Sequence, residues 1–586
     1  MVACGAPAGE PLPLRADYVD RAGRRALLTS DPTLRRDWYG RPDRRVWAET
    51  GSYRASSAKG RCGGGRDVDV SIEGPLNLWG DCVWLLPQTI APSVAPELTF
   101  RGGPGIALAG WTPEDATLEL DGDAHHLEAG VFRIPIERAG LHHARVEGVP
   151  AHLEVQMRTD EPPDPVRVDH AIVVVIDTLR ADRLRPFDAT SRVRLPRVEA
   201  LAEHADVFTR AFATASWTKP AVASMLTGLY PWEHRALTHS ASLRDVRTLP
   251  EVLGDFGVDT IAISGNGYVS PSFGLDRGFA RFMPVGALGR GRLSDEVEVL
   301  FETLDEREPS RFFAYLHATD PHSPYAPQPE HLRRFDPEPY HGPIDFADDP
   351  MLLRRLNDGE LAIDERDRER LRALYDGEVA GLDAAFAALF EGLAQRRLLA
   401  RTLVVIVADH GEELADHGLW GHGGGRLHRE LIQVPLMMWW PGVSAGRRVG
   451  AVASQIDVPA TVLDAMDLHQ DLGSRSARSL RALPPHRFVL FGQRDDRRGV
   501  TDGHMTLVRD RDGTMTLFDH DTDPRELHEQ ARERPRARRY LLQGLAREMA
   551  LNPTHREPTP RQPPPVTDVD ATVASQLQAL GYVGDE

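Results

Sequence analysis

The sequence predicts an α/β fold, with a central sheet flanked by helices and smaller β-rich parts on either side of it in the chain. From residue 171, apolar runs of strand length such as "AIVVVI" and "LVVIVA" alternate with amphipathic stretches. Runs that are apolar at every position are typical of strands buried on both faces. At 586 residues, 41% apolar and 27% charged, the chain is globular in composition, and it is long enough for roughly two to four domains.

Residues 1–160 are predicted to form a small β-rich accessory domain. The short alternating stretches "ATLELDG", "GVFRIPI" and "AHLEVQM" are separated by Gly, Pro and Asp, which is typical of strands joined by turns. The segment "RTDEPPDPVRVD" then predicts a linker, because its prolines oppose a helix and its charges oppose burial. The sequence indicates no role for this domain.

The α/β domain is expected over residues 168–480. Its clearest helix is predicted in "RERLRALYDGEVAGLDAAFAALFEGLAQRR", where apolar residues recur along one face. This stripe contains Leu371, Leu374, Val379, Leu382, Phe386 and Leu389. In residues 481–550, "RFVLFG", "MTLVRD" and "TMTLFD" flank an "RDG" turn and predict a small antiparallel sheet. Residues 551–586 are expected to form a Pro-rich flexible tail that ends in a short helix.

The charge and hydropathy of the chain exclude two kinds of partner. The net charge is −18, and no basic cluster is present. This balance argues against binding to nucleic acid or to an anionic membrane surface. The longest apolar runs are too short to form a transmembrane helix.

The three cysteines favour an exported protein. "MVACGAP" resembles the cleavage box of a bacterial lipoprotein, which makes Cys4 a candidate lipid anchor, although the apolar segment that should precede it is missing. Cys62 and Cys82 could form one disulfide in an oxidising compartment, or they could be two free thiols. We therefore expect a periplasmic protein or an outer-surface lipoprotein.

Acidic and histidine side chains follow several of the predicted strands. In open α/β sheets, ligands bind beyond the carboxyl ends of the strands. Carboxylates and imidazoles gathered there can hold a divalent metal, although an Asp after a strand can equally be a turn or capping residue. A further histidine, His422, lies in the glycine-rich loop "GHGGGRLHRE". The strand-end residues are Asp177, His317, Asp320, His322, Asp409 and His410.

Thr218 is a candidate nucleophile in the stretch "SWTKPAVASMLTGLYP". The pattern predicts a helix with Thr218 as its N-cap, Pro220 in its first turn and Gly228 near its end. A helix N-terminus presents free N–H groups and a positive dipole end to an anion. A metal held by Asp177, Asp409 and His410 would activate the hydroxyl. Spacing alone does not separate the nucleophile from a plain N-cap.

Seven ordered motifs resemble the sulfatase family of the alkaline-phosphatase superfamily. The resemblance covers about 170–530 and leaves the first 160 residues uncovered. It implies the family's central α/β sheet and a C-terminal subdomain. The motifs are "IDTLRAD", "SWTKPAVASMLTGLYPWEHRA", "TLPEVLGDFGVDTIAISGN", "HATDPHSPY", "VADHGEEL", "GHGGGRLHRELIQVPLMMWWPG" and "LFDHDTDPREL".

The resemblance implies a metal site at Asp177, Thr218, Asp409 and His410. In the frame where sulfatases carry a cysteine or serine that becomes formylglycine, this chain has Thr218, which cannot be converted. Thr218 therefore resembles the nucleophile of the threonine branches of the superfamily, which act on phosphoesters. Val222 stands where sulfatases carry an anion-binding arginine, and Thr178 replaces a usual acidic neighbour of the first metal aspartate.

Further residues are carried over as substrate-binding groups. Asn266 stands in the region of one sulfatase lysine and His422 in place of another, while the family's substrate histidine is retained as His322. Lys219, next to the nucleophile, is expected to help neutralise the ester oxygens. A second metal site could draw only on Asp320, His322 and His422, so we expect one divalent ion per chain, with zinc, manganese, calcium and magnesium all open.

The function predicted from these residues is metal-dependent hydrolysis of phosphate or sulfate esters through Thr218, with phosphoesters favoured. The substrate is expected to be a small anionic ester or an ester-bearing glycan or lipid. Two alternatives remain open at this stage. One is a transferase that passes a phospho-group to an alcohol. The other is an inactive sulfatase-like binding protein, against which the retained metal residues argue.

Overall fold

The computed structural model describes most of the chain. It covers residues 167–551 apart from 287–290, 423–424, 443–445, 469–471, 485–486 and 494–496, and before these it covers strands and turns between residues 17 and 157. The linker at 158–166, the tail at 552–586 and the side chains of Cys4, Cys62 and Cys82 lie outside the described residues. The expectations for a lipid anchor, a disulfide and a flexible tail therefore stay predictions.

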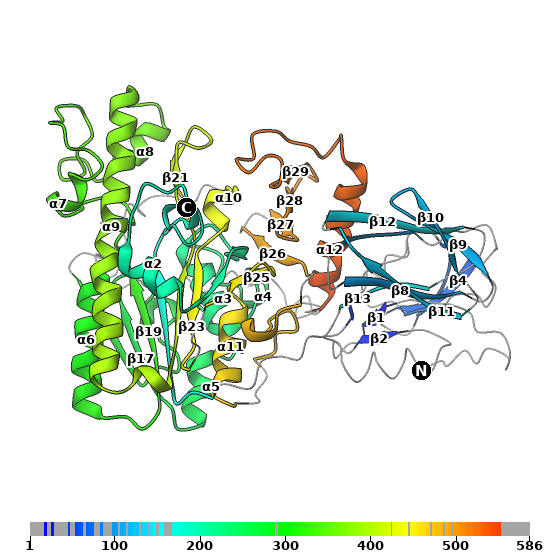
Figure 1. Ribbon diagram of the computed structural model, residues 1–586, viewed down its shortest axis with the longest axis horizontal. Helices are drawn as coiled ribbons and strands as arrows, with labels where there is room; N and C mark the ends of the chain where they lie inside the picture. The colour runs from blue at the N-terminus through cyan, green and yellow to red at the C-terminus, as the bar shows by residue number, and fades with distance from the viewer. Residues whose placement is uncertain are drawn as a thin grey trace.

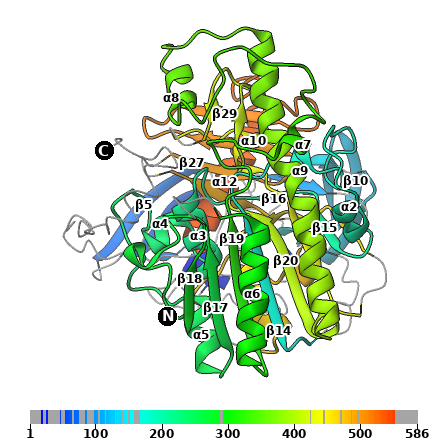
Figure 2. The same ribbon diagram turned by 90° about the vertical axis from the view of Figure 1, so that its left-hand side faces the viewer.

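An eight-stranded mixed sheet forms the centre of the α/β domain. Its long middle strands are buried at every position, which suits a sheet covered on both faces. Figure 2 shows β18, β17, β19 and β20 across the sheet. The strand order is β18 (Arg281–Pro284), β17 (Asp259–Ser264), β19 (Phe312–Ala318), β14 (His170–Ile176), β20 (Thr402–Ala408), β23 (Leu436–Trp439), β15 (Asp206–Phe208) and β24 (Arg448–Val449).

The middle of this sheet is parallel. β14 pairs in parallel with β19 on one side and with β20 on the other, and β17 pairs in parallel with β19 and β18. β23 is antiparallel to both β20 and β15. Three parallel neighbours, β19, β14 and β20, therefore end at one edge, where the sequence predicted the metal residues.

Helices cover both faces of the sheet. Figure 1 shows α6 and α9 on one side and α3 and α11 on the other. The predicted apolar stripe of α9 is confirmed, since all six of its residues are buried in the main core. The helices are α2 (Pro196–Ala202), α3 (Thr218–Thr227), α4 (Pro231–His234), α5 (Leu249–Asp255), α6 (Leu293–Arg307), α7 (Pro329–Leu332), α8 (Leu352–Asn357), α9 (Glu365–Gln395), α10 (Arg429–Ile432), α11 (Asp457–Ala465) and α12 (Pro535–Leu551).

A four-stranded antiparallel sheet follows, as the sequence predicted. It runs in order as β26 (Val489–Gly492), β27 (Arg498–Thr501), β28 (Met505–Arg509) and β29 (Met515–Asp519). The "RDG" turn joins β28 to β29. Leu490, Leu507 and Leu517 form a separate core with Tyr540 and Leu541 of α12.

The strands described before residue 167 are short and pair antiparallel. β9 coincides with "ATLEL" and alternates between buried and exposed residues. One sheet contains β10 (Asp123–Leu127), β9 (Ala116–Leu120), β12 (Gly140–Glu147) and β7 (Glu97–Gly102), and another contains β11 (Gly130–Ile136), β8 (Ile106–Thr112), β13 (His152–Met157) and β3 (Arg45–Val46). The remaining strands are β1 (Asp17–Val19), β2 (Arg25–Leu27), β4 (Tyr53–Cys62), β5 (Arg66–Gly74) and β6 (Val83–Leu85).

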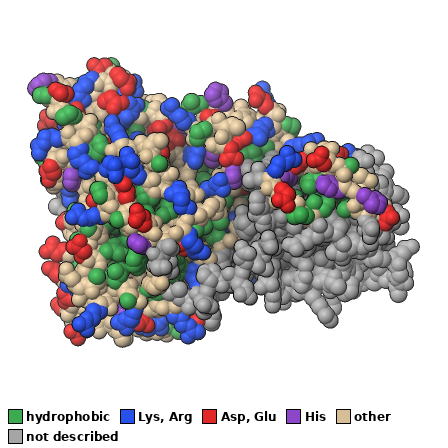
Figure 3. Space-filling view, in the orientation of Figure 1, with side chains coloured by type: hydrophobic (Ala, Val, Ile, Leu, Met, Phe, Trp, Pro, Cys, Tyr) green, Lys and Arg blue, Asp and Glu red, His purple; other side chains and the backbone are tan. Residues whose placement is uncertain are grey.

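The surface carries charged side chains of both signs. Figure 3 shows acidic and basic side chains interspersed over the visible face of the α/β domain rather than segregated by sign. Among the described residues, no helix is long and apolar enough to cross a membrane.

Candidate functional site

The candidate site lies where β14 and β20 end side by side. Ile176 of β14 pairs with Ala408 of β20 in parallel register. The next residue of each strand, Asp177 and Asp409, therefore leaves the sheet at the same edge, and both side chains are fully buried. Sheet topology alone thus brings together two carboxylates that are far apart in the sequence.

Each of these carboxylates has one oxygen held by the protein and one without a hydrogen bond. Asp177 Oδ2 accepts a 2.6 Å hydrogen bond from Asn266 Nδ2. Asp409 Oδ1 accepts from the backbone N–H groups of Thr178 at 3.2 Å and His410 at 2.8 Å. Asp177 Oδ1 and Asp409 Oδ2 make no hydrogen bond although they are buried. Both unpaired oxygens lie near one atom of His410.

That atom is Nε2 of the His410 ring. The Nδ1 atom lies 2.8 Å from the carbonyl oxygen of Gly411, which can only accept, so Nδ1 carries the proton and Nε2 of the neutral ring carries a lone pair. Nε2 is 3.6 Å from Asp177 Oδ1 and 3.5 Å from Asp409 Oδ2. Three electron-rich atoms, two carboxylate oxygens and Nε2 of His410, therefore converge in a buried space.

A divalent cation fits this arrangement. The ligand atoms of Asp177, Asp409 and His410 lie within 4.8 Å of one another. Buried acceptors that face one another are costly unless a positive charge neutralises them. Two carboxylates and one imidazole suit zinc or manganese and tolerate magnesium or calcium.

The pKa values of these groups reflect the same crowding. Burial raises the pKa of Asp409 to about 7, and the charge of Asp177 adds to the rise. Burial also opposes ionisation of Asp177, but His322, His317 and His410 outweigh it and hold its pKa below the usual range. Burial lowers the pKa of His410 to about 4, which keeps its ring neutral and able to bind a metal.

Thr218 enters the site from the first turn of α3. Its hydroxyl oxygen lies 3.4 Å from His410 Nε2, and the residue is fully buried. The expectation that Thr218 is the N-cap is wrong: Trp217, with extended backbone, occupies that position, and Thr218 is the first helical residue. Gly228 ends the helix in the left-handed conformation, as predicted, with φ 71°. The Thr218 hydroxyl therefore faces the metal-binding residues.

His322 and His422 border the same site. The His422 ring centroid is 4.4 Å from that of His410 and 4.9 Å from that of His322. Nδ1 of His422 lies 3.2 Å from Glu412 Oε1, and Nδ1 of His322 donates to the carbonyl of Ser323 at 2.5 Å. Burial lowers the pKa of His422 to about 3 and raises that of Glu412 to about 8. Two imidazoles thus stand beside the hydroxyl and the carboxylates.

Asn266 and Lys219 occupy positions different from those expected. Asn266 was expected to bind substrate, but its side chain is 2% exposed, donates to Asp177 and accepts from the backbone N–H of Tyr268 at 2.8 Å. Lys219 was expected to act on the ester. Its Nζ instead donates to the carbonyls of His239 at 2.7 Å and Ala241 at 2.8 Å. Asn266 therefore orients a carboxylate, and Lys219 is engaged elsewhere.

The Lys219 ammonium group lies in an aromatic cage. It is 4.1 Å from the ring centroid of Phe273, 5.3 Å from that of Tyr268 and 5.8 Å from that of Trp217. Ring faces and carbonyl oxygens both stabilise a buried cation. Lys219 thereby fixes the entry to α3, one residue after the hydroxyl of Thr218.

Asp320 was a candidate ligand for a possible second metal site, although one ion per chain was expected. Its Oδ2 accepts a 2.8 Å hydrogen bond from the backbone N–H of Leu293, at the start of α6. It lines a small pocket with Arg292, Thr319 and His322. Among the described residues, Asp320, His322 and His422 do not form one of the groups whose ligand atoms converge. The geometry therefore gives one metal site at the strand ends.

The sequence assigned no role to two buried residues of this site: His317 was named only as a strand-end residue, and Glu412 was not named. His317 Nε2 is 3.6 Å from Asp177 Oδ2, and Glu412 contacts His422. Both had a signal in the sequence. His317 interrupts the apolar strand "FFAYLHA", and Glu412 follows the Asp-His pair in "DHGEE".

Comparison with curated proteins shows distant relatives of several activities. A choline-sulfatase of Rhizobium meliloti (strain 1021) is 21% identical over 345 residues, which are 50% of this chain and 66% of the relative. Human arylsulfatase K is 32% identical over 100 residues, 17% of this chain and 18% of the relative. A multifunctional alkaline phosphatase superfamily protein of Trinickia caryophylli, PehA, is 24% identical over 381 residues, 50% of this chain and 73% of the relative. The chain thus spans less than two thirds of the length of the first two relatives.

Solved structures share the fold. A phosphonate monoester hydrolase of Agrobacterium radiobacter aligns with a TM-score of 0.54 at 21% identity. The alignment covers 66% of this chain and 97% of the hydrolase. A protein solved with its substrate D-glucosamine-2-N,6-O-disulfate has a TM-score of 0.55 at 16% identity and covers 67% and 100%. The profile of the family described as Sulfatase matches residues 169–468, which contain all the metal-binding residues named above. The chain belongs to the sulfatase family.

Proposed function

We propose that the chain is a metal-dependent ester hydrolase that uses Thr218 as its nucleophile and prefers phosphate esters to sulfate esters. One observation carries the proposal. The Thr218 hydroxyl lies 3.4 Å from the lone-pair nitrogen of His410, beside the unpaired oxygens of Asp177 and Asp409. A hydroxyl placed among metal ligands is activated for attack. Sulfatase-family membership supports a hydrolase of sulfuric or phosphoric esters.

Asp177, Asp409, His410 and the Thr218 hydroxyl would hold the divalent cation, which lowers the pKa of that hydroxyl and offsets the charge of the ester. The proton of the Thr218 hydroxyl passes to solvent, and Oγ attacks phosphorus in line with the leaving group. The new O–P bond forms as the bond to the leaving oxygen breaks, and that oxygen keeps the electron pair and takes a proton from solvent. Water then attacks the phosphothreonine, which releases phosphate and restores the hydroxyl.

The remaining groups of the site would bind the oxygens that do not react. The ring of His422 lies against the rings of His410 and His322 at the edge of the site. When protonated, the ring nitrogens of His322 and His422 would donate hydrogen bonds to the ester oxygens. Glu412 holds His422 in place through their 3.2 Å contact. The N-terminal turn of α3 adds its positive dipole end. Arg292 lines the pocket next to His322 and supplies a cation for an anionic substrate.

The proposed preference for phosphate rests on the identity of two residues, Thr218 and Val222. Threonine cannot give formylglycine, and Val222 stands where the sulfatase frame would place a cationic arginine. A phosphate monoester carries more negative charge than a sulfate ester, so it gains more from the metal and depends less on the missing arginine. The relatives include both a phosphonate monoester hydrolase and sulfatases, so the family alone does not decide between the two.

The substrate class we propose is a small anionic ester or an ester-bearing glycan or lipid. A structural neighbour acts on a disulfated glucosamine, and one of the curated relatives is named a choline-sulfatase. Both are polar esters of modest size. A site bordered by histidines and one arginine suits such head groups better than it suits an extended polymer.

A second candidate is a group transferase with the same nucleophile. A low-salt glycan biosynthesis sulfotransferase of Haloferax volcanii is 25% identical over 261 residues, which are 44% of this chain and 54% of that relative. In a transferase, an alcohol rather than water would attack the phosphothreonine. Turnover in the presence of glycerol separates the two, because a transferase forms glycerol phosphate at the expense of free phosphate.

A panel of p-nitrophenyl phosphate, its diester and its sulfate tests the hydrolase proposal. We expect a higher kcat/KM on one of the phosphoesters than on the sulfate, and metal-free protein should be inactive. Thr227, in the last turn of α3, gives a matched control because its hydroxyl bonds only backbone groups, the carbonyl of Ala223 and the N–H of Leu229. Thr227→Ala should keep kcat where Thr218→Ala loses it. A higher kcat/KM on the sulfate than on both phosphoesters would refute the preference.

A further inference from the structure

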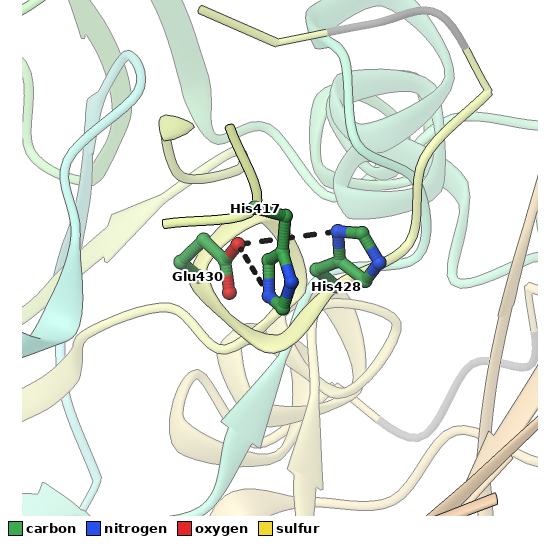
Figure 4. Close-up of side chains that lie close together, drawn as sticks. All are labelled: His417, His428 and Glu430. Carbon is green, nitrogen blue, oxygen red and sulfur yellow. Dashed lines mark ion pairs between the residues drawn. The ribbon is translucent and has the colours of Figure 1, made fainter. Parts of the chain in front are cut away.

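A second group of metal-binding side chains lies apart from the Thr218 site and plays no part in the proposed reaction. It consists of His417, His428 and Glu430, shown in Figure 4. His417 lies between the short strands β21 (Glu413–Leu414) and β22 (Trp420–Gly421), and Glu430 lies in α10, for which His428 is the N-cap. The loop between two strands and the start of a helix thus meet through three side chains.

The distances within this group suit a single small cation. His417 Nε2 is 3.2 Å from Glu430 Oε1, and His428 Nδ1 is 4.0 Å from the same oxygen. In a tetrahedral zinc site, two ligand atoms lie about 3.3 Å apart. Small side-chain rotations therefore bring all three atoms to zinc distance without moving the backbone.

Two buried atoms of this group face each other without a hydrogen bond between them. His417 Nε2 and Glu430 Oε1 are buried atoms, and neither makes a hydrogen bond despite the short distance between them. The two imidazole rings stack with centroids 3.8 Å apart, an arrangement that disfavours protonation of both rings. Zinc binds the neutral imidazole, so it would displace a proton from His428, where burial opposes the charged form, but the hydrogen bond to Glu413 and the charges of nearby carboxylates outweigh burial and raise the pKa.

Glu413 lies next to this group, but its carboxylate oxygens are not among the ligand atoms that converge within 4.8 Å of one another. Its Oε1 lies 3.0 Å from His428 Nδ1, while its other oxygen is paired with Arg426 at 2.9 Å. The Glu413 side chain is fully buried, and those of His417 and His428 are 16% and 30% exposed. The contact with Glu413 therefore orients His428, and the partly exposed imidazoles leave the group accessible to an ion from solvent.

We propose that His417, His428 and Glu430 bind one zinc ion that ties the β21–β22 hairpin to α10. Two imidazoles and one carboxylate form a ligand set that favours zinc over magnesium and calcium, and a water molecule would complete a tetrahedral site. Because His417 comes from the hairpin and the other two residues from α10 and its N-cap, the ion would link the two elements.

The place of the group explains what such an ion would stabilise. Gly411, next to His410, packs so closely on α10 that an added Cβ would lie 1.9 Å from the carbonyl oxygen of Glu430. Its N–H donates to the carbonyl of Leu431 at 2.8 Å. Fixing α10 against the hairpin therefore also fixes the segment that carries His410.

Zinc binding to the full chain in an Asp409→Asn background tests this proposal, because that substitution disables the Thr218 site. After removal of metals, we expect about one zinc equivalent by titration, and cobalt in its place should give the visible absorption of a tetrahedral site. Adding His417→Ala should remove this equivalent and abolish the rise in Tm that zinc produces. His341→Ala, which alters an exposed histidine outside both groups, should change neither.

Glu430→Gln provides a second variant that keeps the size of the side chain, should His417→Ala fail to fold. It should weaken zinc binding by at least about 10-fold. If the Asp409→Asn protein binds no zinc, or if either variant keeps the full equivalent and the full rise in Tm, the proposal is wrong. These outcomes do not depend on turnover, so they leave the proposed function untouched.

Discussion

The hydroxyl oxygen of Thr218 lies 3.4 Å from Nε2 of His410, although 192 residues separate the two in the chain. The helix N-terminus supplies the hydroxyl and the end of β20 supplies the imidazole. Since Nδ1 of His410 bonds the carbonyl of Gly411, Nε2 faces the hydroxyl with a lone pair. Both atoms are therefore available to the same cation.

Asp409→Asn should have opposite effects on stability with and without metal. In metal-free protein, the substitution removes a buried charge next to Asp177 and turns an unpaired oxygen into an amide donor facing His410. The metal-free variant should therefore be more stable than the parent, by roughly 1–3 kcal/mol. With metal, the parent should be the more stable protein. Thermal unfolding of both proteins with and without metal checks this, and the same ranking in both conditions would count against a cation at this site.

Asn266→Ala separates a positioning role from a substrate-binding role. The amide holds Asp177 Oδ2 at 2.6 Å, so its loss should weaken metal binding by about 10- to 100-fold. At saturating metal, KM should change little. A raised KM with unchanged metal affinity would restore the role in substrate binding that the sequence suggested.

Lys219→Met should lower stability more than activity. The substitution removes the donor of two carbonyls, that of Ala241, which is buried, and that of His239, which is partly buried. An unpaired buried carbonyl costs roughly 1–3 kcal/mol, and a partly buried one costs less because water can reach it. Below the new Tm, kcat/KM should stay within several-fold of the parent. A loss of kcat by orders of magnitude in a variant of normal Tm would place Lys219 in the reaction after all.

His422→Ala should reduce turnover without removing metal. His422 borders His410 and His322 but does not belong to the group of converging ligands. We expect kcat/KM to fall by about 10²-fold or more while the metal content of the Thr218 site stays unchanged. Elemental analysis together with kinetics checks both parts, and loss of a metal ion in this variant would show that His422 is a ligand.

Much of the site followed from the sequence because sheet topology dictates it. Asp177 and Asp409 end strands that are apolar throughout, and such strands are central and parallel, so their carboxyl ends had to meet. The apolar stripe of α9 could be predicted because its apolar residues recur with the period of a helix. These features depend on backbone pattern rather than on side-chain packing.

The directions of long or amphipathic side chains did not follow from the sequence. Lys219 adjoins Thr218 in the chain, yet its ammonium group turns into an aromatic cage built from distant residues. The sequence does not show whether the Asn266 side chain faces a substrate or a carboxylate. In the structure it contacts Asp177, which follows another strand of the same sheet. The group of His417, His428 and Glu430 likewise depends on how α10 packs against the β21–β22 hairpin.

The central claim is that Thr218 becomes covalently modified during turnover. Mixing metal-loaded protein with p-nitrophenyl phosphate, quenching in acid and mapping peptides by mass spectrometry tests it directly. The account predicts a phosphoryl group on Thr218, absent from Thr218→Ala, whose kcat should fall by at least about 10³-fold, while Thr218→Ser keeps part of the activity. Near-normal turnover by Thr218→Ala, or a phosphoryl group on another residue of an active enzyme, would contradict the account.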